Sequence, residues 1–267
     1  MTGQQNVYFH IGLSRAASTA LQRDVFPAAQ ALGKGSSYNQ DTGADQLSAL
    51  FTTRSPTVWR EEEGQKVAQA LADSNDTGTI LLSREHLYNN YFFVGFDNPQ
   101  RPLIQCNPYF LAEHLRAFKQ YAWGDRGKVG LIFLARNQAD WLISRYSRSS
   151  HRVKKASQED FQRKIGQILE KPAAFGAQTL EFDLLTTVLG DALGPGNVLP
   201  EIFERISEGQ VLRNIVEFTG LTQLDVDYFN RADGGQRYTQ TSKDGGTWVI
   251  RAYKPDWMFF LNVTVRR

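Results

Sequence analysis

The residues whose types and spacing suggest chemistry begin close to the start of the chain, between positions 7 and 22. A run of β-branched and aromatic residues, Val7 to Ile11, leads into Gly12, and the hydroxyl residues Ser18 and Thr19 follow shortly afterwards. A strand, a tight turn and a helix start in this order direct successive backbone N–H groups inward and add the partial positive charge of a helix N-terminus. The stretch predicts a binding site for a phosphate or sulfate group.

The spacing of this loop argues against an ordinary nucleoside triphosphate site. The Walker pattern is Gly, any four residues, then Gly-Lys-Ser/Thr. Counted from Gly12, the last three places hold Ala17, Ser18 and Thr19, so the lysine that contacts the β- and γ-phosphates is missing. The one cation of the loop, Arg15, lies earlier. An ATP-dependent phosphotransferase stays open as an alternative.

A second anion-binding pattern follows a second apolar run, from 128 to 135. Arg136 and Asn137 end this run, and Asp140, Ser144 and Tyr146 come in the helix that we expect next. Arginine suits a phosphate because its planar guanidinium bonds two phosphate oxygens at once. The alternative for Arg136 is a salt bridge at the strand end.

Both patterns resemble the nucleotide motifs of the sulfotransferases that use 3′-phosphoadenosine 5′-phosphosulfate (PAPS). In that family the 5′-phosphosulfate loop has the sequence His-Ile-Gly, followed by Lys-Thr-Gly-Thr-Thr and then by a small residue, Leu and Gln. Here Arg15 replaces the Lys and Ala17 the Gly, and Gln138 replaces the Pro of the family's Arg-Asn-Pro motif for the 3′-phosphate. The donor-binding residues implied by the resemblance are Arg15, Ala16, Ala17, Ser18, Thr19, Arg136 and Ser144.

Two further residues are candidates for moving a proton. Thr79 to Ser83 reads as a buried strand, and Glu85 and His86 follow its carboxyl end. Ligands of open α/β sheets sit at such strand ends. Either side chain can accept the proton of an acceptor hydroxyl, and related sulfotransferases use a carboxylate after the second strand as base. Arg15 would stabilise charge on the bridging oxygen but, always protonated, would hardly donate a proton.

For three other segments the sequence allows more than one role. The aromatic residues between 87 and 110 suit either an acceptor pocket or the core, and the basic run from 145 to 155 suits either an anion or a solvated helix face. Related enzymes cover the nucleotide with a loop like that of 231 to 246. Its candidates, Arg237, Tyr238 and Lys243, fit a mobile surface loop equally well.

Composition limits the class of protein. The chain has 267 residues, 41% hydrophobic and 22% charged, with a net charge of +2. That charge is too small to indicate nucleic acid as a partner. The single cysteine, Cys106, allows no internal disulfide, and we expect a cytoplasmic protein without a transmembrane segment. No clustering of His, Cys and Asp indicates a metal. The sequence does not predict the oligomeric state.

The elements form an α/β pattern. Strands are expected at 7–11, 79–83, 128–135 and 197–203, the last at a sheet edge because of Pro200. Helices are expected at 18–32, 58–71, 111–121, 139–149, 158–169, 180–193 and 211–218, and near the C-terminus from Trp248. Lys34 to Thr53 is expected to be irregular. We predict one three-layer domain over residues 1–267, with a mainly parallel sheet and a P-loop-like nucleotide-binding core.

The resemblance implies a sulfotransferase. It would move a sulfuryl group from PAPS to an acceptor hydroxyl, which we expect to be on a carbohydrate, and release adenosine 3′,5′-bisphosphate. The alternatives are a P-loop phosphotransferase and a non-catalytic nucleotide-binding protein.

Overall fold

The structure is a computed structural model. It describes residues 4–12, 17–26, 43–73, 78–84, 87–88, 107–172, 180–231, 243–244, 247–248 and 250–251.

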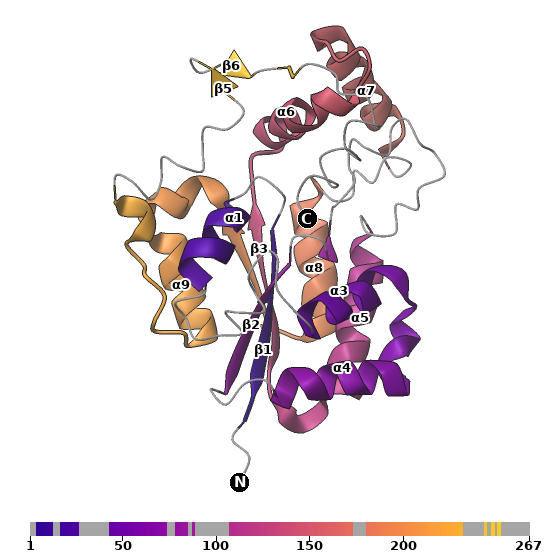
Figure 1. Ribbon diagram of the computed structural model, residues 1–267, viewed down its shortest axis with the longest axis vertical. Helices are drawn as coiled ribbons and strands as arrows, with labels where there is room; N and C mark the ends of the chain where they lie inside the picture. The colour runs from indigo at the N-terminus through magenta and orange to yellow at the C-terminus, as the bar shows by residue number, and fades with distance from the viewer. Residues whose placement is uncertain are drawn as a thin grey trace, which may run out of the picture.

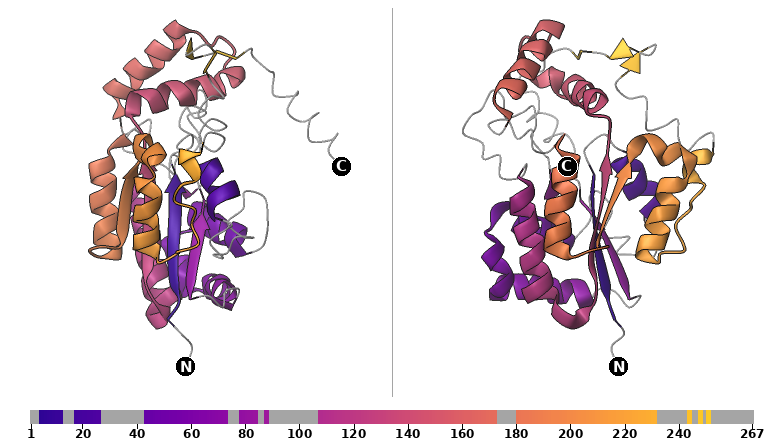
Figure 2. Two further views of the ribbon diagram at one scale, coloured as in Figure 1. Left: turned by 90° about the vertical axis from the view of Figure 1, so that its left-hand side faces the viewer. Right: turned by 180° about the vertical axis from the view of Figure 1, so that it is seen from behind.

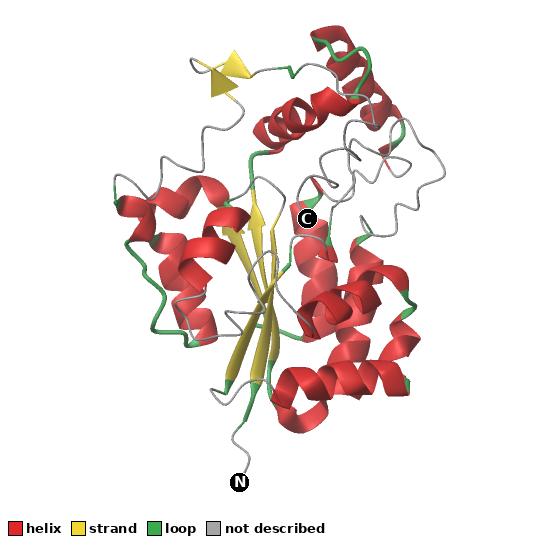
Figure 3. Ribbon diagram, viewed as in Figure 1, coloured by secondary structure: helices red, strands yellow, loops and turns green. Residues whose placement is uncertain are grey.

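A four-stranded parallel sheet forms the centre of the molecule (Figures 1 and 3). Its strands are β1 (Asn6–Gly12), β2 (Thr79–Ser83), β3 (Val129–Ala135) and β4 (Val198–Ile202), and they pair in the order β2-β1-β3-β4. The four predicted strands are confirmed, including the edge position of β4 with Pro200. The two central strands are almost wholly buried, as continuous apolar runs in parallel sheets usually are.

Helices cover both faces of this sheet, which confirms the three-layer α/β architecture (Figure 2). Alternate residues of β1 supply the two cores: Val7, Phe9 and Ile11 face one layer, and Tyr8 faces the other. The first layer contains α3 (Gly43–Thr53), α4 (Glu62–Asp73), α5 (Pro108–Ala117) and α8 (Phe182–Leu193). The second contains α1 (Ser18–Ala20), its continuation η1 (Leu21–Val25) and α9 (Gln210–Thr219).

Two further helices lie beyond the carboxyl ends of the strands. These are α6 (Gln138–Ser149) and α7 (Gln158–Glu170), at the top of Figure 1. The side chain of Asn137 accepts the N–H of Asp140 and caps α6, and Ser157 caps α7 in the same way by accepting the N–H of Asp160. Short helical turns complete the described chain: η3 (Pro56–Arg60), η6 (Phe118–Trp123), η7 (Gly124–Arg126), η8 (Ser150–Arg152), η11 (Phe203–Glu208) and η12 (Tyr228–Asn230).

Three expectations about local structure were wrong in part. The polar stretch before Thr53 contains α3, because Leu47, Leu50 and Phe51 recur at helical spacing and are buried. The helix expected at 58–71 is divided at Glu61 into η3 and α4. Trp248 lies in β6 (Thr247–Trp248), which pairs antiparallel with β5 (Lys243–Asp244), rather than in a helix.

Candidate functional site

Gly12 ends β1, and a side chain there would collide with Ser18. A Cβ atom built on Gly12 would lie 2.0 Å from Ser18 Oγ and 3.6 Å from Cε1 of His10. The φ angle of Gly12 is not in the left-handed region, so glycine is required for space and not for conformation. The first turn of α1 can therefore pack directly on the end of β1.

Ala17, which precedes α1, has a backbone conformation that normally favours glycine. Its φ is 59° and its ψ 7°, and it is the one non-glycine residue with positive φ in the described ranges. The left-handed region costs an L-residue about 1–2 kcal/mol. Its carbonyl accepts the N–H groups of Ala20 and Leu21 at 2.9 and 3.1 Å. A left-handed residue next to helical ones forms a backbone nest, a concavity that suits an anion.

Ser18 belongs to a group of buried polar side chains beneath this turn. Ser83 Oγ lies 2.6 Å from His10 Nδ1, and the Gln22 amide donates to the carbonyl oxygen of Ser83 at 3.3 Å. Ser18, Gln22 and His10 are at most 3% exposed. Burial lowers the pKa of His10 to about 3, so the ring is neutral. We call these four residues the His10 cluster.

Arg136 follows β3 and is partly withdrawn from water. Its guanidinium lies 4.9 Å from the centre of the Phe203 ring. Burial lowers the pKa of Arg136, and the carboxylates of Asp140 and Glu204 act in the opposite direction. The backbone N–H of Asn137 donates to Glu204 at 2.9 Å, which fixes the turn between β3 and α6. A guanidinium at a strand end suits a bound phosphate because its planar group can bond two phosphate oxygens at once.

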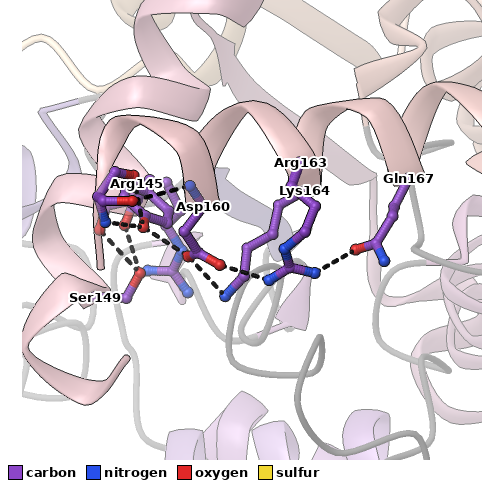
Figure 4. A network of polar contacts seen from close by, with 8 residues as sticks. Arg145, Ser149, Asp160, Arg163, Lys164 and Gln167 are labelled. Atoms are coloured by element: carbon purple, nitrogen blue, oxygen red, sulfur yellow. Dashed lines mark hydrogen bonds and ion pairs between the residues drawn. The ribbon is translucent and has the colours of Figure 1, made fainter. Parts of the chain in front are cut away.

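Ser144 lies on α6 and is fully buried. The helix is held in place by a polar network with α7, centred on Asp160 (Figure 4). Tyr146 donates its hydroxyl proton to Asp160 at 2.7 Å, and Lys164 and Arg163 also reach this carboxylate. Because Lys164 is itself fully buried, the network fixes both helices and with them the position of Ser144.

The two stretches predicted to bind an anion follow neighbouring strands of the sheet. β1 and β3 are adjacent and parallel, and Gly12 pairs with Leu134. Arg136 therefore leaves the sheet close to the level at which the turn after Gly12 begins. The chain leaves β1 for β2 on one side and β3 lies on the other, so this is the topological switch point of the sheet. Ligands of open α/β sheets bind at such points.

Several predicted site residues lie outside the described residues: Arg15, Ala16, Glu85, His86, Arg237 and Tyr238. Thr19 is in the first turn of α1, and Lys243 is in β5. The structure adds Arg84 to the residues near these strand ends. Arg84 is buried, and its backbone N–H donates to the His10 carbonyl at 2.9 Å. His10, Gln22 and Ser83 were not among the predicted site residues; their polarity within apolar segments was the available signal.

Two features are absent from the described residues. These residues hold no group of three or more His, Cys, Asp or Glu that could bind a metal ion. None of their helices is long and apolar enough to cross a membrane.

The chain was also compared with known proteins. No protein-family model matches it, and no curated protein matches it either. One solved structure that resembles it is a crystal structure of a sulfotransferase from Alicyclobacillus acidocaldarius, with 14% sequence identity and a TM-score of 0.45 over 86% of this chain and 88% of that chain. At this level of similarity, the function has to be argued from the residues of the site.

Proposed function

We propose that this chain is a PAPS-dependent sulfotransferase that transfers a sulfuryl group to an acceptor hydroxyl, on a carbohydrate. The observation that carries the proposal is the adjacency of β1 and β3. In this register the end of β1 at Gly12 pairs with Leu134, two residues before Arg136. Gly12 and Arg136 belong to the two stretches whose sequences resemble the family's 5′-phosphosulfate and 3′-phosphate motifs.

The described residues fit such a donor. Ser18 Oγ is buried and has no hydrogen-bond partner within the described part of the chain, so it is available to an oxygen of the donor. The nest at Ala17 and the N–H groups up to Thr19 would hold the 5′-phosphate. Arg136 would bind the 3′-phosphate, and Ser144 is assigned to the same phosphate by the resemblance.

The chemistry would need little covalent participation from the protein. The bound donor would supply the sulfuryl group. Its bond to the phosphate oxygen breaks as a bond to the acceptor oxygen forms, and the acceptor proton passes to Glu85 or His86. Glu85 and His86 follow β2 in the sequence. The last residue of β2, Ser83, pairs with His10 near the carboxyl end of β1. Arg15 would stabilise the charge that develops on the leaving oxygen.

The proposal also includes the acceptor and the cellular location. Most of the aromatic stretch between 87 and 110 lies outside the described residues, but Tyr88 is buried and Tyr109 is half exposed. Aromatic faces near the strand ends would suit a sugar ring. We propose a cytoplasmic enzyme, in keeping with the lone Cys106.

Calorimetric titration with adenosine 3′,5′-bisphosphate, and with ADP for comparison, tests the proposal. We expect a clear preference for the bisphosphate and a ~10- to 100-fold weaker affinity in Arg136→Ala, because hydrogen bonds to charged groups contribute about 1.5–3 kcal/mol. Arg60→Ala is the matched control: its guanidinium also stacks on an aromatic ring, that of Tyr121, but lies away from the strand ends.

The other outcomes decide between the alternatives. Equal or tighter binding of ADP and ATP would favour a phosphotransferase. Tight bisphosphate binding without a sulfated product, for a panel of sugar acceptors supplied with PAPS, would indicate a non-catalytic nucleotide-binding protein. For a purely electrostatic role, Arg15→Lys should keep activity and Arg15→Ala should lose it, and equal activity of Arg15→Ala and wild type would exclude the role.

A further inference from the structure

Each end of β3 is flanked by a cation that lies over the ring of a half-buried phenylalanine. Before the strand, Lys128 Nζ is 4.3 Å from the centre of the Phe218 ring. After the strand, the guanidinium carbon of Arg136 is 4.9 Å from the centre of the Phe203 ring. Both cations are attracted by the negative face of the ring. Only the second contact lies at the carboxyl ends of the strands, where ligands of open α/β sheets bind.

The pairing of β3 with β4 places Phe203 beside Arg136. Ala135 pairs with Ile202, the last residue of β4, and Arg136 and Phe203 follow directly. Leu134, two residues before Arg136, faces the second helical layer, and Phe203 packs against the same layer. Because alternate residues of a strand share a face, the two chains continue beyond the sheet with the guanidinium and the ring on one side. The contact therefore follows from the register of the sheet.

The stacked ring and a bound phosphate would use different parts of the guanidinium. Arginine stacks on an aromatic ring through its planar face, whereas its N–H donors lie in the plane and point outward from the edge. A phosphate bonds two of these donors at the edge. The Phe203 ring thus restricts the rotamers of Arg136 without competing for its donors. A side chain that is already held in its bound geometry loses less conformational entropy on binding.

The next residue, Glu204, fixes the backbone of the turn that carries Arg136. Its carboxylate accepts the N–H of Asn137 at 2.9 Å. The side chain of Asn137 in turn accepts the N–H of Asp140 at 3.2 Å and caps α6. Phe203 and Glu204 therefore contact, one the side chain and the other the backbone, the segment that leads from β3 into α6.

We propose that Phe203 is a positioning residue for the 3′-phosphate of the nucleotide. Its ring holds the guanidinium of Arg136 in the orientation that binds this phosphate, and Glu204 supports the ring by fixing the turn. The ring itself has no donor for the phosphate and acts through Arg136. The inference rests on the proposed function for the identity of the ligand, whereas the contact between ring and guanidinium does not depend on that function.

Adenosine 3′,5′-bisphosphate and AMP separate this role from a general loss of structure, because AMP lacks the 3′-phosphate. In Phe203→Leu we expect calorimetry to show ~10-fold weaker binding of the bisphosphate, the effect of one cation–π contact, and AMP affinity within about twofold of wild type. Phe203→Tyr keeps an aromatic face and should restore the bisphosphate affinity to within about threefold of wild type. Equal losses for both nucleotides in Phe203→Leu, or no recovery with tyrosine, would overturn the proposal.

Phe218→Leu is the matched control, because it removes the cation–π contact at the opposite end of the same strand. It should leave both affinities unchanged. A double-mutant cycle tests whether Phe203 acts through Arg136. In an Arg136→Ala background, Phe203→Leu should weaken bisphosphate binding further by less than about twofold. Independent, multiplying effects of the two substitutions would contradict the proposed link.

The supporting role of Glu204 has its own pair of variants. Glu204→Gln keeps an acceptor oxygen for the N–H of Asn137 and should bind the bisphosphate within about twofold of wild type. Glu204→Ala removes the acceptor, and we expect ~3-fold weaker binding. Glu208→Ala is the control, since Glu208 lies in the same short helix, η11, and pairs with Arg205 at 3.5 Å. Equal affinities of Glu204→Ala and Glu208→Ala would remove Glu204 from the proposal.

Proton NMR of the arginine side chains supplies a readout that needs no nucleotide. An aromatic ring current shifts the signals of protons held over its face. In the ligand-free protein, the Nε–H signal of Arg136 should therefore move in Phe203→Leu and stay in place in Phe218→Leu. If wild type shows no preference for the bisphosphate over AMP but this signal moves, the proposed function fails and the link between ring and guanidinium stands. If the signal is the same in all three proteins, the positioning role is wrong whatever binds.

Discussion

Two of the histidines that the structure describes are fully buried, on opposite sides of the central sheet, and their surroundings differ in one respect. His114 on α5 has both ring nitrogens bonded: Trp59 Nε1 donates to Nδ1 at 3.0 Å, and Nε2 lies 3.1 Å from the Arg54 carbonyl oxygen. Because indole can only donate, this neutral ring has a fixed tautomer. His10 has a described partner only at Nδ1.

The difference separates a structural histidine from a candidate functional one. Around His114, the aromatic rings of Phe51, Trp59, Phe110 and Phe118 pack together, and both ring nitrogens of His114 are bonded. At His10, three buried polar atoms (His10 Nε2, Ser18 Oγ and Gln22 Oε1) have no described hydrogen-bond partner. Since unpaired buried polar atoms cost about 1–3 kcal/mol each, such a group is expected where a ligand contributes the missing bonds.

The largest effect on stability should come from His114→Leu. The substitution leaves the indole N–H of Trp59 and the Arg54 carbonyl without their partner, and we expect a loss of ~3 kcal/mol in the free energy of unfolding by urea. In His10→Leu only the Ser83 hydroxyl loses a described hydrogen-bond partner, so the loss should be ~1 kcal/mol. A greater loss at His10 than at His114 would contradict the comparison.

Alanine substitutions at two glycines test the same comparison, because each adds a methyl group at a crowded position. In Gly12→Ala the new Cβ displaces Ser18, and we expect a ~100-fold weaker affinity for adenosine 3′,5′-bisphosphate, since displacements of about 1 Å at a site have effects of this size. In Gly64→Ala the Cβ would lie 2.3 Å from the Val58 carbonyl oxygen. Overpacking should reduce stability by ~1–3 kcal/mol there and leave calorimetric affinity unchanged. If Gly12→Ala and Gly64→Ala bound the bisphosphate equally well, Gly12 would not be part of the proposed anion site.

Acid should destabilise the protein through both rings. Burial lowers the pKa of His114 to about 4 and that of His10 to about 3, from 6.5 in the unfolded chain. The unfolded state therefore binds more protons between these values, and stability falls as pH falls from 6.5 towards 4 and 3. Each ring should account for ~2 kcal/mol of the loss between pH 7 and pH 5. Urea unfolding of His114→Gln should show a pH dependence flatter by that amount; an unchanged slope would contradict it.

The smallest effect is expected at Ala17. Glycine adopts its left-handed conformation without the steric cost but loses more entropy on folding, so Ala17→Gly should raise stability by only ~0.5 kcal/mol. Ala20→Gly is the matched control: its φ of −68° is helical, and the same substitution should destabilise by ~1 kcal/mol. Thermal unfolding of the two variants should move in opposite directions.

The strands could be predicted because each is a short apolar run bounded by turn residues. The two stretches that we propose bind an anion stand out in the sequence because each pattern is local, and their role stays a prediction. α3 was missed because the polar residues before it concealed the spacing of Leu47, Leu50 and Phe51. The His10 cluster could not be predicted, because it depends on the register that pairs His10 with Ser83, and register between distant parallel strands is set by the whole packed sheet.

The position of β1 in the middle of the sheet has a consequence for biosynthesis. β1 is synthesised before both of its neighbours, because β2 and β3 begin at Thr79 and Val129. Until then its strand edges have no native partner and are exposed to wrong pairing, as unpaired strands of slowly assembled parallel sheets are. A nascent chain that ends before Val129 contains the stretch that we propose binds an anion but lacks the sheet that would position it. Holdase chaperones should therefore engage the first half of the chain.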